Sequence, residues 1–297
     1  MEFHPFAALA MSLVILSTWL PVKPLTKIVI AGLFVAGLFG FGYLQLTAIV
    51  AIAVLGTLAF AANRPSPAWL KWIWVILWFL LAAAMMLHWI PGFHNMLVVE
   101  DQVMKAGSLP FSLNWNFDKP FVGWTLLVFC SLVLINPKAL IKQAHWGLLI
   151  LLIGNSLLIG LALASGIVRW DPQWVNITWI FLANNLLMTC VAEEVVFRGV
   201  LQSYLSKKFG QWIGAQSAPE TSKLIPSKGD LFALCLTSLV FGLVHFAGGP
   251  GLIVFATIAG LVYGYAYWKT QSLEWAILAH FSLNALHFVF FSYPMLA

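Results

Sequence analysis

Three charged side chains fall inside the apolar runs of this chain, all between positions 193 and 198. They are Glu193, Glu194 and Arg198, whereas small shifts of the predicted span ends move every other formal charge into a loop or to a span end. A charge at the centre of a bilayer costs roughly 2.5–3.5 kcal/mol on insertion scales, so ionisable residues there indicate a functional site by default. The simpler alternative is an ion pair that joins two helices.

Helical geometry gives these three residues different roles. Glu194 and Arg198 are four positions apart, so they share a helix face and are expected to form an ion pair. Glu193 is rotated by about 100° from Glu194 and by about 140° from Arg198, and therefore points away from the cation on its own helix. We predict that Glu193 is the reactive group, a general base, and that Glu194 and Arg198 support it structurally.

Two histidines and one asparagine farther along the chain are candidates to meet Glu193. His245 lies in a later apolar run, and His280 and Asn284 lie four residues apart on one face of the last run. Counted at about 1.5 Å per residue from the nearest cytoplasmic charges, the depths of Glu193, His245, His280 and Asn284 are roughly 21, 22, 16 and 22 Å. A lone histidine in an apolar helix is more often a packed core residue, but the similar depths favour one site.

These four side chains carry the parts for hydrolysis of an amide bond. A glutamate beside a histidine can deprotonate water, and a second histidine with an asparagine carboxamide can donate hydrogen bonds to a developing oxyanion. No serine or cysteine nucleophile is predicted beside a base at this depth. The mechanism so predicted needs no cofactor. Zinc is the alternative, because glutamate and histidine are zinc ligands, although the spacing is not that of an HExxH helix.

Composition indicates the elements that must position these residues. Hydrophobic residues make up 62% of the chain and charged residues 8%, and the mean hydropathy is +0.93. A soluble domain has roughly 25% charged residues, so a soluble fold is excluded. The apolar runs are about 17–22 residues long, enough for a helix to cross ~30 Å of hydrocarbon. Because strand-like alternation is absent from these runs, we predict an all-α transmembrane helical bundle.

We predict about eight to ten membrane spans, the lower number allowing for the tight join between the second and third. The apolar runs are residues 3–20, 28–44, 46–62, 72–90, 121–135, 146–168, 174–197, 231–246, 252–268 and 273–291. Eleven lysines and arginines then fall in alternate loops on one side, against Lys105, Lys119 and Arg169 on the other. The positive-inside rule therefore predicts that both termini lie outside. Dispersed in short loops, these charges indicate topology and not nucleic-acid binding.

Three short motifs resemble those of a known protease family. Residues 192–199, Ala-Glu-Glu-Val-Val-Phe-Arg-Gly, resemble the EExxxR motif of the type II CAAX prenyl endopeptidases, which belong to the wider CPBP or ABI family. Residues 241–245, Phe-Gly-Leu-Val-His, resemble the FxxxH motif of that family, and residues 280–284 resemble its HxxxN motif. Each motif alone is weak, but the ordered triple in membrane helices is specific. The resemblance covers about residues 174–292.

The resemblance implies an activity and a role for each motif residue. In the family, the first glutamate and the FxxxH histidine activate water, which corresponds here to Glu193 and His245. The last histidine and asparagine stabilise the oxyanion, which corresponds to His280 and Asn284. We therefore expect an intramembrane glutamate-dependent endopeptidase, with residues 1–170 as additional N-terminal spans and residues 171–297 as the catalytic membrane domain.

The expected partners are a peptide or protein substrate, CAAX-like or otherwise membrane-associated, and the lipid bilayer. Lipid modification of the substrate and the oligomeric state stay open. We expect a multi-pass protein of the plasma or inner membrane of a prokaryote, with the cytoplasmic loop of residues 210–230 as a candidate gate. The alternatives are a transporter, against which the lack of a visible internal repeat counts, and a non-catalytic scaffold of the bacteriocin-immunity type.

Overall fold

The computed structural model describes residues 2–130, 133, 135, 137–212 and 224–297. Helices dominate these residues, together with one small two-stranded sheet. Each apolar run predicted from the sequence contains a helix, so the predicted all-α bundle is confirmed. Residues 213–223 of the candidate gate, among them Lys223, lie outside the described residues, and the gate stays a prediction.

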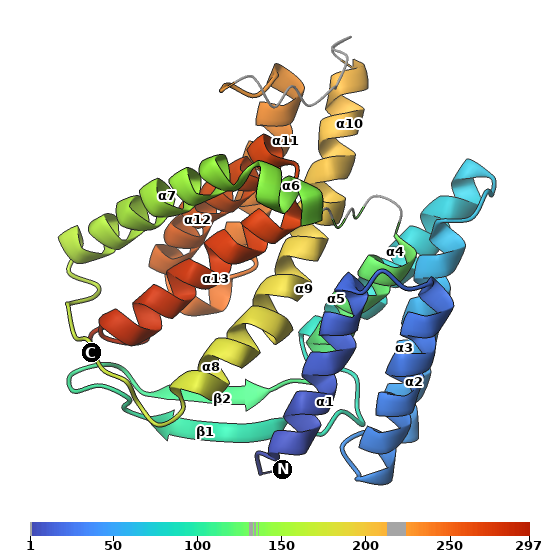
Figure 1. Cartoon of the computed structure of the whole chain (residues 1–297), viewed down its shortest axis with the longest axis horizontal. Coiled ribbons are helices and arrows are strands. Elements are labelled where there is room, and N and C mark those ends of the chain that lie inside the picture. The colour runs from blue at the N-terminus through green and yellow to red at the C-terminus, as the bar shows by residue number, and fades with distance from the viewer. Residues whose placement is uncertain (1, 131–132, 134, 136, 213–223) are drawn as a thin grey trace. The chain divides into compact units, whose positions relative to one another are not determined.

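The chain forms two compact units whose segments alternate along the sequence (Figure 1). The first unit comprises Met1–Gln102, Phe111–Val133 and Trp179–Glu193. The second unit comprises Val103–Pro110, Leu134–Thr178 and Glu194–Ala297. The chain thus passes from the first unit to the second between Glu193 and Glu194. The sequence predicted that the catalytic domain begins at residue 171, and this boundary stays a prediction.

The first unit consists of apolar helices and a β-hairpin. Its elements are α1 (Pro5–Leu16), η1 (Ser17–Trp19), α2 (Pro24–Gly40), α3 (Leu46–Ala62), α4 (Ala68–Met86), β1 (Met96–Gln102), β2 (Phe111–Trp115) and α5 (Asp118–Phe129). Helix α3 packs against α4 and α5, and α1 packs against α2 and α5. The strands pair antiparallel, with Met96 opposite Trp115. This hairpin lies between the predicted spans of residues 72–90 and 121–135.

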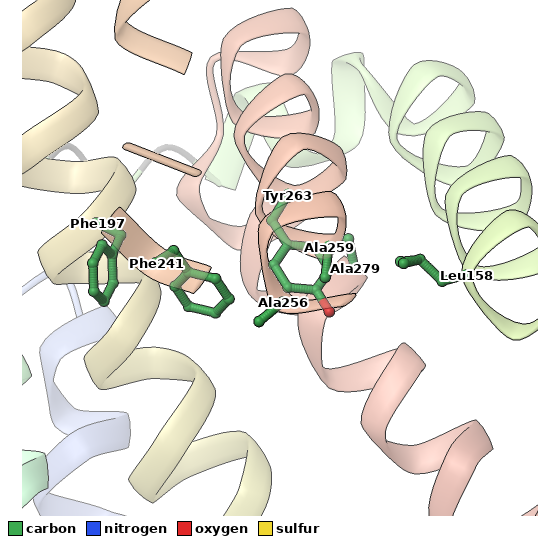
Figure 2. Close-up of a cluster of buried hydrophobic side chains, with 7 residues drawn as sticks. All are labelled: Leu158, Phe197, Phe241, Ala256, Ala259, Tyr263 and Ala279. Atoms are coloured by element: carbon green, nitrogen blue, oxygen red, sulfur yellow. The ribbon is translucent and has the colours of Figure 1, made fainter. Parts of the chain in front are cut away.

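The second unit is a bundle built around α12. Its elements include α6 (Pro137–Lys142), α7 (Ala144–Ala164), α10 (Ser203–Trp212), α11 (Lys228–Leu243), η4 (Phe246–Gly248), α12 (Gly249–Thr270) and α13 (Leu273–Phe290). Helix α12 packs against α7, α11 and α13. Figure 2 shows the core that these helices share, in which the rings of Phe197, Phe241 and Tyr263 lie among alanines and Leu158.

Small residues let the helices of this bundle approach closely. A Cβ atom added to Gly154 of α7 would lie 2.3 Å from the side chain of Val262 on α12. One added to Gly260 would lie 3.1 Å from the Cα atom of Ser238 on α11. Such contacts are typical of membrane helices, because close backbone packing replaces the hydrophobic driving force that lipid does not supply.

One helical run continues well past its predicted end. It consists of α8 (Thr178–Asn184), η2 (Asn185–Cys190), α9 (Val191–Glu194), η3 (Val195–Gln202) and α10. The apolar pattern predicted an end at residue 197, with Lys207 and Lys208 in a loop, but the run extends to Trp212 over 35 residues. At 1.5 Å per residue it is about 52 Å long, whereas the hydrocarbon core is ~30 Å thick. Apolarity reports contact with lipid, so it does not locate a helix end beyond the bilayer.

Length and composition identify five helices of the described chain that can cross a membrane. They are Ala68–Met86, Ala144–Ala164, Thr178–Trp212, Phe246–Thr270 and Leu273–Phe290. Three apolar helices are shorter: Pro5–Trp19, Pro24–Gly40 and Leu46–Ala62. Across the longer and the shorter helices, many large apolar side chains are exposed, among them Leu9, Phe79 and Ile153. The chain is an integral multi-pass membrane protein, while the orientation of its termini stays a prediction.

A buried ammonium group holds the C-terminal end of α13 in the second unit. The Lys105 Nζ atom donates hydrogen bonds to the carbonyls of Asp171 at 2.9 Å, Val289 at 3.1 Å and Phe291 at 2.6 Å. The last carbonyls of a helix lack partners within it and carry partial negative charge. Burial lowers the pKa of Lys105 below its usual value, which the charge of Asp171 partly opposes.

We expect Lys105→Met to destabilise the protein, because it removes the ammonium donor from the buried Phe291 carbonyl and from the partly buried Asp171 carbonyl, whereas the Val289 carbonyl keeps the Gln173 N–H. The expected loss is about 1–3 kcal/mol, seen as a lower midpoint of thermal unfolding in detergent. Lys142→Met, at an exposed lysine of α6, is the matched control and should leave the midpoint unchanged. Equal midpoints for the two variants would contradict this account of α13.

Candidate active site

The two motif glutamates sit on a single α-helical turn between two π-helical stretches. The turn is α9, flanked by η2 and η3. Segments of π-helix are rare and frequently occur at functional sites, because they change the direction in which side chains leave the helix. Here they lie on both sides of Glu193 and Glu194, so the local backbone is irregular where the sequence placed the reactive group.

Glu194 forms the ion pair that its spacing from Arg198 predicts. The Arg198 Nε atom lies 3.0 Å from Glu194 Oε2, and neither side chain is exposed. The guanidinium also donates to the Gly260 carbonyl at 3.2 Å, and it lies 4.7 Å from the centre of the Phe241 ring. Pairing, a carbonyl acceptor and an aromatic face together compensate for burying this cation.

The second oxygen of the same carboxylate contacts His280. The His280 Nδ1 atom lies 2.9 Å from Glu194 Oε1. The imidazole ring stacks on Tyr263, with centroids 4.6 Å apart and planes 14° apart. Glu194 therefore binds an arginine of its own helix and a histidine of α13 at once. Sequence reasoning missed this contact, because helical spacing does not reveal which faces of two separate helices meet.

The contact with Glu194 determines the hydrogen-bonding state of His280. A carboxylate only accepts hydrogen bonds, so Nδ1 is the nitrogen that carries a proton. In the neutral ring Nε2 is then an acceptor, and it donates only in the imidazolium form. Glu194 therefore fixes the orientation of the His280 ring through Nδ1.

His245 lies just beyond the end of α11, and not inside the helix as the predicted span of residues 231–246 had it. Its Nδ1 atom is 2.7 Å from the Phe241 carbonyl, and its ring centroid is 4.8 Å from that of Phe241. Because a carbonyl only accepts, Nδ1 carries a proton, and in the neutral ring Nε2 is then an acceptor. The Phe241 ring also contacts His280, at 5.7 Å between centroids, so one phenyl group packs against both histidines.

The remaining predicted residues lie on α13 and in the first unit. Asn284 is one turn beyond His280 on the continuous helix α13, so the shared face expected from the spacing is retained. In the first unit, the Glu193 Oε1 atom lies 2.6 Å from the Nζ atom of Lys119. The sequence placed Lys119 in an outward loop, but it belongs to the first turn of α5. No motif in the sequence signals this contact.

Metal coordination was the alternative considered for these residues. Among the described residues, no three histidine, cysteine, aspartate or glutamate side chains lie close enough together to hold a metal ion. Zinc remains a hypothesis for a chelation experiment.

Comparison with known families identifies the part of the chain that carries the motifs. Residues 173–286 match the family model described as type II CAAX prenyl endopeptidase Rce1-like. This segment is similar to an Rce1-like domain. The resemblance predicted from the motifs is thereby confirmed, and the match includes Glu193, Glu194, Arg198, His245, His280 and Asn284. The family that this model describes consists of CAAX-type endopeptidases, so the match makes segment 173–286 similar to a membrane protease domain.

The match leaves the first 172 residues outside the family model. Comparisons with curated proteins and with solved structures returned no similar protein. The residue roles therefore rest on the motifs and on the contacts described above.

The double contact of Glu194 predicts that stability and activity respond differently to substitution. Glu194→Gln leaves Arg198 buried without its charge partner, which should cost about 3–5 kcal/mol of stability. It also removes the carboxylate that supports His280, so kcat should fall about 100-fold or more, as on loss of an oxyanion donor. Thermal unfolding and peptide cleavage in detergent measure the two effects.

A double variant separates these effects. Adding Arg198→Met to Glu194→Gln removes the unpaired charge and should restore most of the lost stability, but not kcat. Glu100→Gln, at an exposed carboxylate of β1, is the control. Recovery of activity together with stability would show that Glu194 only supports the fold.

Proposed function

We propose that the chain is an intramembrane endopeptidase that uses water activated by Glu193 and His245 to hydrolyse a peptide bond. The observation that carries the proposal is the hydrogen bond from His245 Nδ1 to the Phe241 carbonyl. It leaves Nε2 as a proton acceptor within a domain that matches a protease family. No serine or cysteine nucleophile is needed, because the attacking group is water.

The proposed reaction assigns one step to each motif residue. Glu193 and His245 take a proton from water as its oxygen attacks the substrate carbonyl carbon. His280 and Asn284 donate hydrogen bonds to the oxyanion of the tetrahedral intermediate. The C–N bond then breaks, and the proton taken from water goes to the leaving amine. Glu194 holds His280 in place, and Arg198 holds Glu194.

The proposed substrate is the C-terminal tail of a membrane-associated protein, of the CAAX type or chemically similar to it. The family match supports a peptide or protein substrate. The apolar, lipid-facing surface of the helices supports a substrate held at the membrane by a lipid or by an apolar segment. A preference for prenylated over unmodified peptides would distinguish the two kinds of substrate.

Peptide cleavage by the purified protein in detergent tests this function. A fluorogenic CAAX-type peptide and a mixed peptide library serve as substrates, with Glu193→Gln and His245→Ala as variants. Both variants should lose about 100-fold or more of kcat while staying folded at the assay temperature, because each removes a group that accepts the proton of water. His145→Ala, at an exposed histidine, should retain the wild-type rate.

A strong chelator distinguishes the glutamate mechanism from a metal mechanism. Activity that survives chelation is expected, whereas loss on chelation with recovery in added zinc would establish the metal alternative. Absence of cleavage by the wild-type protein, with all variants folded, would favour a transporter or a scaffold.

A further inference from the structure

The contact between Glu193 and Lys119 joins the protease motif to a part of the chain outside the family match. Lys119 precedes residues 173–286 by more than fifty positions. Its Nζ atom lies 2.6 Å from Glu193 Oε1, and both side chains are largely buried, with 18% and 10% exposed. Exposed ion pairs contribute little to stability, whereas a charge-assisted hydrogen bond shielded from water is stronger and more directional.

The start of α5 is fixed by a set of partly buried polar contacts. The Asp118 Oδ2 atom lies 2.6 Å from His88 Nδ1, and Asp118 Oδ1 accepts from the backbone N–H of Lys119 at 2.8 Å. The backbone N–H of Phe117 donates to Asn95 Oδ1 at 2.9 Å. The Lys119 backbone is therefore held by side chains from the end of α4 and the segment before β1, both within the first unit.

Close packing brings α5 onto the turn that carries Glu193. A Cβ atom added to Gly123 would lie 2.9 Å from the Cα atom of Ala192, so the two backbones touch at the residue before Glu193. Gly123 is four positions after Lys119, which places both on the same face of α5. Helix α1, which also packs against the neighbouring stretch η2, carries no charged residue. Within the first unit, Lys119 thus places a cation against Glu193.

We propose that Lys119 is a positioning residue for Glu193, holding the carboxylate charged and in a fixed orientation for the activation of water. This inference rests on the proposed function of Glu193 as the base. Lys119 contacts one carboxylate oxygen, Oε1, and a nearby cation favours the charged form of a carboxylate in an apolar setting. The N-terminal spans thus contribute a residue to the chemistry of the Rce1-like domain.

Kinetics of two variants of the full-length protein in detergent test this role. Lys119→Met should lower kcat about 10- to 100-fold at pH 7 with KM changed less than about twofold, because the loss affects proton transfer and not peptide binding. The acidic limb of its pH–rate profile should move to higher pH. Lys119→Arg keeps the charge and should retain kcat within about fivefold. Lys71→Met, at an exposed lysine of α4, is the control.

The possible outcomes separate this inference from the proposed function. If Lys119→Met keeps the wild-type kcat and pH profile, the inference is overturned, even if its unfolding temperature falls. The ion pair would then have a structural role only. A rate above wild type would also overturn it, because the ion pair would then hold Glu193 back. If wild-type protein and Glu193→Gln cleave equally, the proposed function fails and the inference fails with it. That result differs from failure of the Lys119 role alone.

Discussion

The carboxylate of Glu194 contacts both an arginine and a histidine in the interior of the second unit. The arrangement of the helices in this unit depends on that double contact. One oxygen pairs with Arg198, and the other contacts His280. Removing an ion from water costs several kcal/mol, and only good geometry and full hydrogen bonding repay that cost. Helix α13 must therefore present His280 at one position, and α12 must present the Gly260 carbonyl to the guanidinium.

The apolar surroundings make this polar cluster rigid. Phe241 packs against both histidine rings and the Arg198 guanidinium, and Tyr263 stacks on His280. Gly154 lets α7 approach α12, and Gly260 lets α12 approach α11, to distances at which an added Cβ atom would be crowded. The same packing that excludes lipid thus fixes the imidazole rings, and their backbone and carboxylate partners determine which nitrogen carries a proton. The same few side chains therefore stabilise the packing and carry the proposed chemistry.

The sequence predicted what depends on one helix at a time. The apolar runs located the helices, the four-residue spacing predicted the Glu194–Arg198 pair, and three ordered motifs indicated the family. Contacts between helices were not predictable, because periodicity defines the faces of a helix but not the partners of each face. The Glu194–His280 and Lys119–Glu193 contacts are of this kind. The hairpin and the extension of the motif helix to Trp212 lie where hydropathy carries no signal.

The central claim is that activated water attacks the peptide directly, and trapping of the products tests it most directly. Cleavage would be run in ¹⁸O-water with hydroxylamine present, and the products and the enzyme would be analysed by mass spectrometry. Direct attack predicts one ¹⁸O atom in the new carboxylate, no hydroxamate and no peptide bound to the enzyme. A hydroxamate product or a peptide–enzyme adduct would reveal a covalent intermediate and contradict the account.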